Sequence, residues 1–336
     1  MSDRDLVVVG GSLGALEAAT ALLAGLPGDL PAAVLMVITP ARPRDAEALD
    51  GAGPLPVVPA THGDALSPGR VYVAPPDRHL LVGPDNRVHL SKAPQYHRLR
   101  PAIDPLMLTA ARWAAHRTVG VLLSGVFDDG IAGLAALGLH GGMTAVQHPD
   151  DAAYPDLPGV AIRMRPDHVA PATGLAVALP GLLGTPASTP VDPDPVLTME
   201  TDMLTHDTAE GPGGQFGHPV PVGCPDCGGG MHRVDIAGTI RYRCHVGHAF
   251  APHSMLAAQG ENVEAGLLTV ASTLRDRAEI YRQLAARADT AADADRYRDA
   301  ARETGKTAAT LQDLRQQLSS VLPMEQPERE RVGHHG

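Results

Sequence analysis

Five short apolar runs, separated by alanine-rich segments of helical length, constrain the fold of this 336-residue chain more than any other feature. Continuous apolar runs bounded by glycine and proline turns are typical of strands buried on both faces of a parallel sheet. The pattern therefore predicts a doubly wound α/β domain with a mainly parallel sheet. The runs are Leu6–Val9, Val34–Ile38, Arg70–Ala74, Val119–Ser124 and Gly142–Gln147.

Composition divides the chain into five parts. We expect the α/β domain over residues 1–185, followed by a segment rich in proline, glycine and acidic residues over 186–219. That segment has too little apolar surface to bury, which predicts a linker. A compact Cys/His module is expected over 220–252, a helical region over 253–322 and a polar tail over 323–336.

The helical region carries apolar residues at helical spacing. The pattern predicts one long amphipathic helix and a partner helix, packed as an antiparallel hairpin. A hairpin that packs only on itself is the favoured interpretation, and self-association through these helices is the alternative. The residues of the pattern are Val263, Leu267, Val270, Leu274, Ile280 and Leu284, then Leu311, Leu314 and Leu318.

Composition also limits the function class. Twenty-seven basic against 38 acidic residues leave a net charge of −11, which argues against nucleic acid as a partner, since phosphate binding needs clustered cations. The sequence has no apolar run long enough to span a bilayer and no secretory signal at its start, so membrane insertion is not expected. All three cysteines fall in one short stretch, which predicts a metal site in a reducing compartment, the cytoplasm.

The first apolar run stops at Gly10-Gly11-Ser12-Leu13-Gly14, and a helical pattern begins at Ala15. A serine in a tight glycine turn between strand and helix suits a nucleophile, because glycines tolerate the turn and nearby backbone N–H groups stabilise an oxyanion. A dinucleotide-binding loop is disfavoured, because Ser12 replaces the second glycine of that fingerprint and no acid follows the next strand. From this motif alone, Ser12 could equally cap the helix.

A second strand and turn carry two acids. The run Val119–Ser124 is followed by Gly125-Val126-Phe127-Asp128-Asp129-Gly130. Acids at the carboxyl end of a strand lie where open α/β sheets place their active sites, and one of them could orient a catalytic base. Asp128 could instead be a helix cap or a turn residue.

Five ordered motifs together resemble the catalytic domain of CheB-type protein-glutamate methylesterases. They are VVVGGSLGALEA, PGRVYVAPPDRHLLV, RPAIDPLM, GVLLSGVFDDGIAGL and AVQHPDDAAYPDLPGVA, and the resemblance runs from about Leu6 to Leu183. It implies a Ser-His-Asp hydrolase without a catalytic cofactor that acts on methylated glutamates of methyl-accepting chemoreceptors, with deamidation of receptor glutamine as a second activity. Ser12 matches the family nucleophile and Asp129 the triad aspartate. The pattern begins within the first residues, so no receiver domain is expected before it.

The chain departs from the family at the triad histidine. The resemblance places that histidine at position 38, where this chain has Ile38. A serine hydroxyl is a weak nucleophile without an adjacent base. Either another histidine serves Ser12, or the chain is a catalytically degenerate binding or regulatory module. The candidates are His62, His79, His97 and His168; for His79 and His168 a structural role is favoured.

The Cys/His module has the spacing of a zinc ribbon. Cys224-Pro225-Asp226-Cys227 is followed by three glycines, a strand-like stretch, and then Cys244 and His248. A C-x-x-C turn brings two thiolates onto one ion, and Cys244 with His248 completes a tetrahedral Cys₃His set. The spacing favours His248 over the adjacent His245. With four protein ligands no open position remains, so we expect a structural zinc ion that stabilises a module with few core residues.

Overall fold

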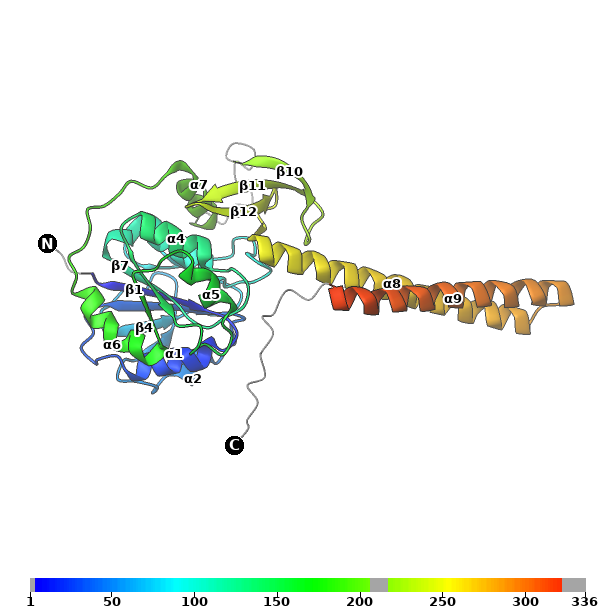
Figure 1. The fold of residues 1–336 in the computed structure, drawn as a ribbon, viewed down its shortest axis with the longest axis horizontal. Helices are drawn as coiled ribbons and strands as arrows, with labels where there is room; N and C mark the ends of the chain where they lie inside the picture. Colours follow the sequence, from blue (N-terminus) through cyan, green and yellow to red (C-terminus); the bar gives the residue numbers. More distant parts are fainter. Residues whose placement is uncertain (1–3, 206–216, 322–336) are drawn as a thin grey trace, which may run out of the picture. The chain divides into compact units, whose positions relative to one another are not determined.

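A computed structural model describes residues 4–205 and 217–321 of the chain. The chain forms two compact units, Met1–Met255 and Leu256–Gly336. The first unit contains the α/β layers and a small antiparallel sheet, and the second contains two long helices (Figure 1).

A seven-stranded sheet in the order β3-β4-β2-β1-β7-β8-β9 forms the centre of the first unit, and every neighbouring pair is parallel. All five apolar runs of the sequence lie in this sheet, which confirms the predicted fold class. The strands are β1 (Leu6–Gly11), β2 (Ala33–Ile38), β3 (Val57–Pro59), β4 (Arg70–Val73), β7 (Thr118–Leu122), β8 (Met143–Gln147) and β9 (His168–Ala170).

Alternating residues of β1 enter two separate cores. Val7 and Val9 pack into the core that contains helices α1 (Ala15–Ala24), α2 (Asp45–Leu49) and α6 (Ala172–Leu183). Leu6 and Val8 pack on the other face, into the core that contains α3 (Ile103–Ala114), α4 (Ile131–Leu139) and α5 (Asp156–Ile162). A sheet buried on both faces explains why its strands read as continuous apolar runs. A hairpin of β5 (His79–Val82) and β6 (Val88–Ser91) packs beside α3, and a 3₁₀ turn, Ala115–Arg117, leads into β7.

The direction of winding reverses at β1. The chain proceeds from β1 to β2 on one side and from β7 to β8 on the other, while β1 and β7 are themselves neighbours. Open α/β sheets bind ligands at the carboxyl ends of the strands that flank such a reversal. The turn containing Ser12 follows β1, and Asp128 and Asp129 follow β7, so all three lie at this edge.

Part of the segment predicted to be a linker is ordered. Helix α7 (Pro195–Thr205) packs against α3, with Leu197 and Leu204 buried. The linker prediction was wrong here because average composition hides four apolar residues at helical spacing, among them Met199 and Met203. Residues 206–216 of the predicted linker and residues 323–336 of the predicted tail lie outside the described part of the chain.

The Cys/His module is a four-stranded antiparallel sheet in the order β10-β11-β12-β13. Its strands are β10 (His218–Gly223), β11 (Gly230–Ile236), β12 (Thr239–Cys244) and β13 (Ala249–Phe250). Val234 and Ile236 of β11 join the apolar core on the α3 face of the main sheet. The module therefore shares a core with the α/β layers.

Helices α8 (Pro252–Ala286) and α9 (Ala291–Val321) form the predicted antiparallel hairpin in the second unit (Figure 1). The rings of Tyr281 and Tyr297 stack near the turn, and Glu264 pairs with Arg315 at 3.9 Å further along. None of the helices within residues 4–205 and 217–321 is both long enough and apolar enough to cross a bilayer.

Alanines, rather than the larger apolar residues, line the contact between α8 and α9. The predicted apolar face was partly wrong, because Val263 is 46% exposed and Val270 is 50% exposed. The buried positions recur every seven residues, the spacing of a two-helix seam, and alanine lets two helices approach closely. These positions are Ala271 and Ala278 on α8 and Ala294, Ala301 and Ala308 on α9.

Candidate active site and metal centre

Ser12 lies in the turn between β1 and α1, with its side chain half-buried. Its Oγ accepts a hydrogen bond from the Val126 N–H at 2.9 Å, and its own N–H donates to the Ser124 carbonyl at 2.9 Å. Gly14, at a φ of 73°, occupies the cap position of α1, which has no side-chain cap. Ser12 therefore does not cap the helix, and the capping alternative is wrong.

Gly125 makes room for the Ser12 hydroxyl. A Cβ atom at Gly125 would lie 2.5 Å from Ser12 Oγ and 2.9 Å from a methyl carbon of Leu157. Such distances are shorter than any van der Waals contact, so a side chain there would displace the hydroxyl. The turns that follow β1 and β7 thus fit together only because position 125 is glycine.

Ile38 ends β2 directly beside the serine turn. In the parallel register of β1 and β2, Ile38 is the partner of Gly11, and the Thr39 N–H donates to the Gly11 carbonyl at 3.0 Å. The Ile38 side chain is 7% exposed and packs in the core on the α1 face. Position 38 is therefore adjacent to the serine turn, and it presents a hydrocarbon there.

Asp129 is engaged away from Ser12. Its carboxylate accepts hydrogen bonds from the N–H groups of Ile103 at 2.8 Å and Asp104 at 2.9 Å, at the start of α3. His97 Nε2 lies 3.6 Å from Asp129 Oδ1. Within the described residues, Asp129 makes no hydrogen bond to Ser12.

His97 lies in a buried network of charged groups. Its Nε2 is 3.3 Å from Asp104 Oδ2, which also accepts a 2.8 Å hydrogen bond from Arg241 of β12. The Ala251 N–H donates to His97 Nδ1 at 3.3 Å, so Nδ1 carries no proton and Nε2 carries one. Both ring nitrogens are thus occupied, and His97 has no nitrogen available for Ser12.

Burial sets the protonation of the two carboxyls in this network. Burial raises the pKa of Asp129 to about 6 against the opposing effect of a charge on His97, and the negative charge of Asp104 acts in the same direction as burial. Burial would also raise the pKa of Asp104, but the Arg241 guanidinium and the His97 hydrogen bond hold it below its ordinary value. Arg241 thus keeps the nearer carboxylate, Asp104, ionised, whereas burial leaves Asp129 easily protonated.

The other candidate histidines have local roles. His79 is fully buried, with its Nε2 3.1 Å from the Pro94 carbonyl and its Nδ1 accepting from the Ala102 N–H. His62 Nδ1 accepts from the Leu90 N–H at 3.2 Å, and His168 lies on β9 at the edge of the sheet. No described histidine makes a hydrogen bond to Ser12.

Asp128 caps a distant helix. It is 4% exposed and accepts four hydrogen bonds from His253 and Ser254, in the first turn of α8. Residues 252–255 of α8 belong to the first unit, so this contact lies within one compact body. Sequence reasoning offered a cap for Asp128 but had no signal for its partners, which lie 125 and 126 positions away.

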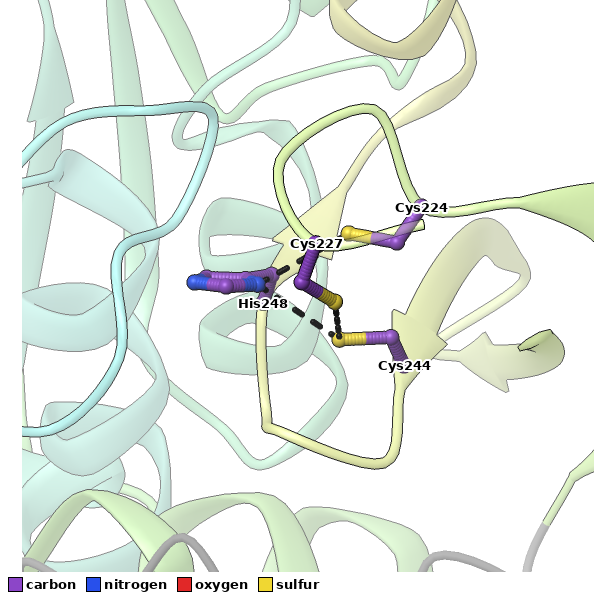
Figure 2. A group of neighbouring side chains, drawn as sticks. All are labelled: Cys224, Cys227, Cys244 and His248. Carbon is purple, nitrogen blue, oxygen red and sulfur yellow. Dashed lines mark hydrogen bonds between the residues drawn. The ribbon is translucent and has the colours of Figure 1, made fainter. Parts of the chain in front are cut away.

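The four predicted metal ligands come together (Figure 2). Cys224 and Cys227 lie in the turn after β10, Cys244 ends β12, and His248 directly precedes β13. His248 Nδ1 is 3.7 Å from Cys224 Sγ and 3.6 Å from Cys244 Sγ, and Cys227 Sγ is 3.7 Å from Cys244 Sγ. All four ligand atoms lie within 4.8 Å of one another.

These separations match the edges of a coordination tetrahedron. Zn–S bonds of about 2.3 Å and Zn–N bonds of about 2.0–2.1 Å give edges of about 3.8 Å between sulfurs and about 3.6 Å between sulfur and nitrogen. The cluster can therefore hold a metal ion. His245 faces the ring of His232 instead, at a centroid distance of 5.0 Å.

Two buried arginines of β12 join the Cys/His module to the α/β layers. Arg241 reaches Asp104, and Arg243 forms a hydrogen-bonded ion pair with Glu200 of α7 and contacts the Tyr96 hydroxyl. All five side chains are at most 7% exposed. Alternation along β12 puts both arginines on one face of the strand, but the sequence did not reveal their partners.

Known proteins are similar to about half of this chain. The model of the CheB methylesterase family matches residues 7–179. A protein named protein-glutamate methylesterase/protein-glutamine glutaminase 5 from Anaeromyxobacter dehalogenans (strain 2CP-C) is 40% identical over 47% of this chain and 45% of its own length. A protein with the same name but the number 1, from Burkholderia pseudomallei (strain 1710b), is 35% identical over 52% of this chain and 50% of its own.

A solved structure agrees with the fold. The crystal structure of the Thermotoga maritima CheB methylesterase catalytic domain superimposes with a TM-score of 0.51 and 28% sequence identity, covering 54% of this chain and all of that domain. The chain spans about half the length of the curated relatives it matches. Because the family model covers more than half of this sequence, the chain belongs to the CheB methylesterase family.

Proposed function

We propose that this protein hydrolyses carboxylic methyl esters of glutamate side chains, with Ser12 as the nucleophile. One observation carries the proposal: Ser12 Oγ is half-buried at the carboxyl edge of β1 and β7 and accepts a hydrogen bond from the Val126 N–H. A hydroxyl held at the reversal of an open α/β sheet is placed for attack on a bound carbonyl. The Val126 N–H is then close enough to stabilise the oxyanion that forms.

The names of the relatives suggest the substrate. They are protein-glutamate methylesterases and protein-glutamine glutaminases, which points to methylated glutamate, and to the glutamine amide as a second substrate. We therefore propose a methyl-accepting chemoreceptor or a similar signalling protein as the partner, and the cytoplasm as the location. We also propose self-association through the helical hairpin, and the boundaries 1–185, 220–252 and 253–322 for the α/β domain, the Cys/His module and the helical region.

Release of methanol from a methylated receptor fragment tests the proposed activity. The native protein should release methanol, and Ser12→Ala should lower the rate by about a thousandfold or more, because a missing nucleophile leaves only binding and oxyanion stabilisation. Thr20→Ala is the matched control, since this exposed hydroxyl on α1 donates only to the Leu16 carbonyl of its own helix. Equal rates for the native protein and Ser12→Ala would reject Ser12 as the nucleophile.

A second candidate function is that of a catalytically degenerate binding or regulatory module. Ile38 at the family's histidine position favours it, as does the engagement of Asp129 with α3 and His97. In that case the protein binds the receptor fragment but releases no methanol. Ile38→His tests this alternative, because it places a base beside Gly11. A gain of methanol release in this variant would show that the rest of the active site is intact, and no gain would show that it is degenerate.

We also propose that Cys224, Cys227, Cys244 and His248 bind one structural zinc ion. The spacing of the four ligand atoms and their mixture of thiolates and imidazole support zinc over harder cations. Metal analysis of the purified protein should find about one zinc ion per chain. Cys244→Ser should lower that content and destabilise the module, whereas His245→Ala, a matched histidine outside the cluster, should leave it unchanged.

A further inference from the structure

His253 is anchored to a buried carboxylate at the start of α8. Its ring Nδ1 lies 3.1 Å from Asp128 Oδ2, and its backbone N–H donates to the same oxygen at 3.0 Å. A carboxylate only accepts hydrogen bonds, so Nδ1 carries the proton and the lone pair of the ring lies on Nε2. Asp128 is 4% exposed and the His253 side chain is 61% exposed, so the ring extends from a buried anchor into solvent.

The pair lies at the same edge of the sheet as the nucleophile. Ser12 Oγ accepts its hydrogen bond from Val126, and Asp128 follows two residues later in the same turn. Two residues span at most about 7 Å of chain. Phe127, between them, has a left-handed φ of 64°, an uncommon conformation for a bulky residue that is typical of turns at functional sites.

The backbone before His253 is held on the first unit. The His97 N–H donates to the Ala249 carbonyl at 2.8 Å, and the Ala251 N–H donates to the His97 ring. Ala249 also belongs to β13, which pairs with β12 of the Cys/His module. The segment that precedes His253 is thus held by His97 and by β12, and a catalytic side chain needs such fixed support.

We propose that His253 is the general base for Ser12 and that Asp128 is its positioning residue. This proposal rests on the proposed ester hydrolysis. It names a general base for a chain that has Ile38, which cannot accept a proton, at the family's histidine position. An imidazole with one nitrogen on a carboxylate and the other bearing the lone pair is the arrangement that activates a serine hydroxyl. Such hydrogen bonds commonly tighten only when substrate is bound.

The proton path balances. The Ser12 Oγ–H proton passes to His253 Nε2 as Oγ bonds to the ester carbonyl carbon, and the protonated ring then gives that proton to the departing methoxide, releasing methanol. A water molecule next attacks the acyl-enzyme and loses a proton to Nε2. That proton returns to Ser12 Oγ when the acyl bond breaks. The glutamic acid product then releases the second proton of that water to solvent, so the products are methanol, the glutamate carboxylate and a proton.

Two readouts on the full-length protein test the assignment. They are the rate at which a fluorophosphonate probe labels Ser12, followed by mass spectrometry, and the hydrolysis of p-nitrophenyl acetate. His253→Ala should lower both rates by about a hundredfold or more, the usual contribution of a general base. Added imidazole should restore part of the lost hydrolysis, measured against the double variant Ser12→Ala/His253→Ala as a blank.

Ser254→Ala is the matched control. Ser254 Oγ donates to Asp128 Oδ1 at 2.5 Å, so this variant weakens the same cap but keeps the imidazole. It should label Ser12 at close to the native rate. A loss that Ser254→Ala shares and that imidazole does not restore would assign His253 to capping alone and overturn the proposal.

The two proposals fail in different ways. If His253→Ala labels Ser12 at the native rate, His253 is not the base, whereas Ser12-dependent hydrolysis still stands. If the native protein does not label at Ser12, and its hydrolysis is unchanged in Ser12→Ala, both the nucleophile and its base are rejected.

Discussion

Asp128 and Asp129 are neighbours in one turn, and the fold gives them opposite surroundings. Asp128 faces the first turn of α8 and holds a histidine that is largely exposed. Asp129 faces the first turn of α3 and His97, which the Cys/His module covers and whose side chain is only 3% exposed. Both carboxylates accept backbone N–H groups at a helix start, which favours an anion in either place. They differ in what covers them.

Because of that difference, Asp129 belongs to a buried cluster of charges, whereas Asp128 holds a side chain that solvent reaches. The Asp129 side needs a cation because two carboxylates, Asp104 and Asp129, are buried there side by side, and Arg241 supplies it from β12. The Asp128 side needs none, since three N–H groups and a hydroxyl satisfy its oxygens. The same dipeptide therefore supports the core on one side and presents a titratable ring to solvent on the other.

Removing Arg241, the cation beside Asp104 and Asp129, should have the largest effect on the free energy of unfolding. Arg241→Leu leaves Asp104 buried without its ion-pair partner, and breaking a buried pair from one side costs about 3–5 kcal/mol. Urea unfolding of the full chain measures this change in the free energy of unfolding. Arg233→Leu on the neighbouring β11 is the control, because its pair with Asp235 is exposed and should be worth less than about 1 kcal/mol. Equal losses for the two variants would contradict a buried, desolvated cluster.

The protonation of Asp129 should appear as a pH dependence of stability. Its pKa is about 6 in the folded protein against an ordinary 3.8, so the folded state binds the proton more tightly. Stability from this group is fully present below about pH 4 and is lost as the pH rises through 6. Relative to Asp129→Asn, the native protein should lose up to about 3 kcal/mol between pH 4 and pH 7.

Urea unfolding of both proteins at each pH gives that difference, in which the other titrating groups largely cancel. Asp128→Asn, in the same turn, is the control for a generic loss of negative charge. A difference between the native protein and Asp129→Asn that stays constant from pH 4 to pH 7 would show that Asp129 is not desolvated as described.

Substitutions at Asp128 and its partner Ser254 should have a smaller effect on stability. Asp128→Ala removes the acceptor of four hydrogen bonds at the start of α8 and should cost about 1–2 kcal/mol, the range for loss of a helix cap. Ser254→Ala removes one of those donors and should cost about 1 kcal/mol or less. Thermal unfolding followed by circular dichroism measures both. A larger loss for Ser254→Ala than for Asp128→Ala would mean that the hydroxyl has another role.

Structural features that depend on residues close together in the sequence could be predicted from it. The apolar runs specify β1, β2, β4, β7 and β8, because burial on both faces of a sheet requires apolar residues at successive positions. The turn at Ser12 and the Cys224, Cys227, Cys244 and His248 set followed from short spacings that bring ligand atoms together locally. The antiparallel helical hairpin followed from helical periodicity, although its alanine seam did not.

Features that depend on partners far along the chain required the tertiary structure. Arg241 meets Asp104 across 137 positions and His253 meets Asp128 across 125, and no local pattern marks either pair. Helix α7 was hidden by the composition of its neighbours, and the alanine seam by larger apolar residues that remain exposed.

The sequence by itself therefore determined the sheet, the serine turn and the Cys/His cluster, since each depends on short spacings and their periodicity. Only the tertiary structure decided what the two acids after β7 do. The pKa and the accessibility of a carboxylate depend on which segments cover it and which donors they bring, and packing between distant parts of the chain sets both.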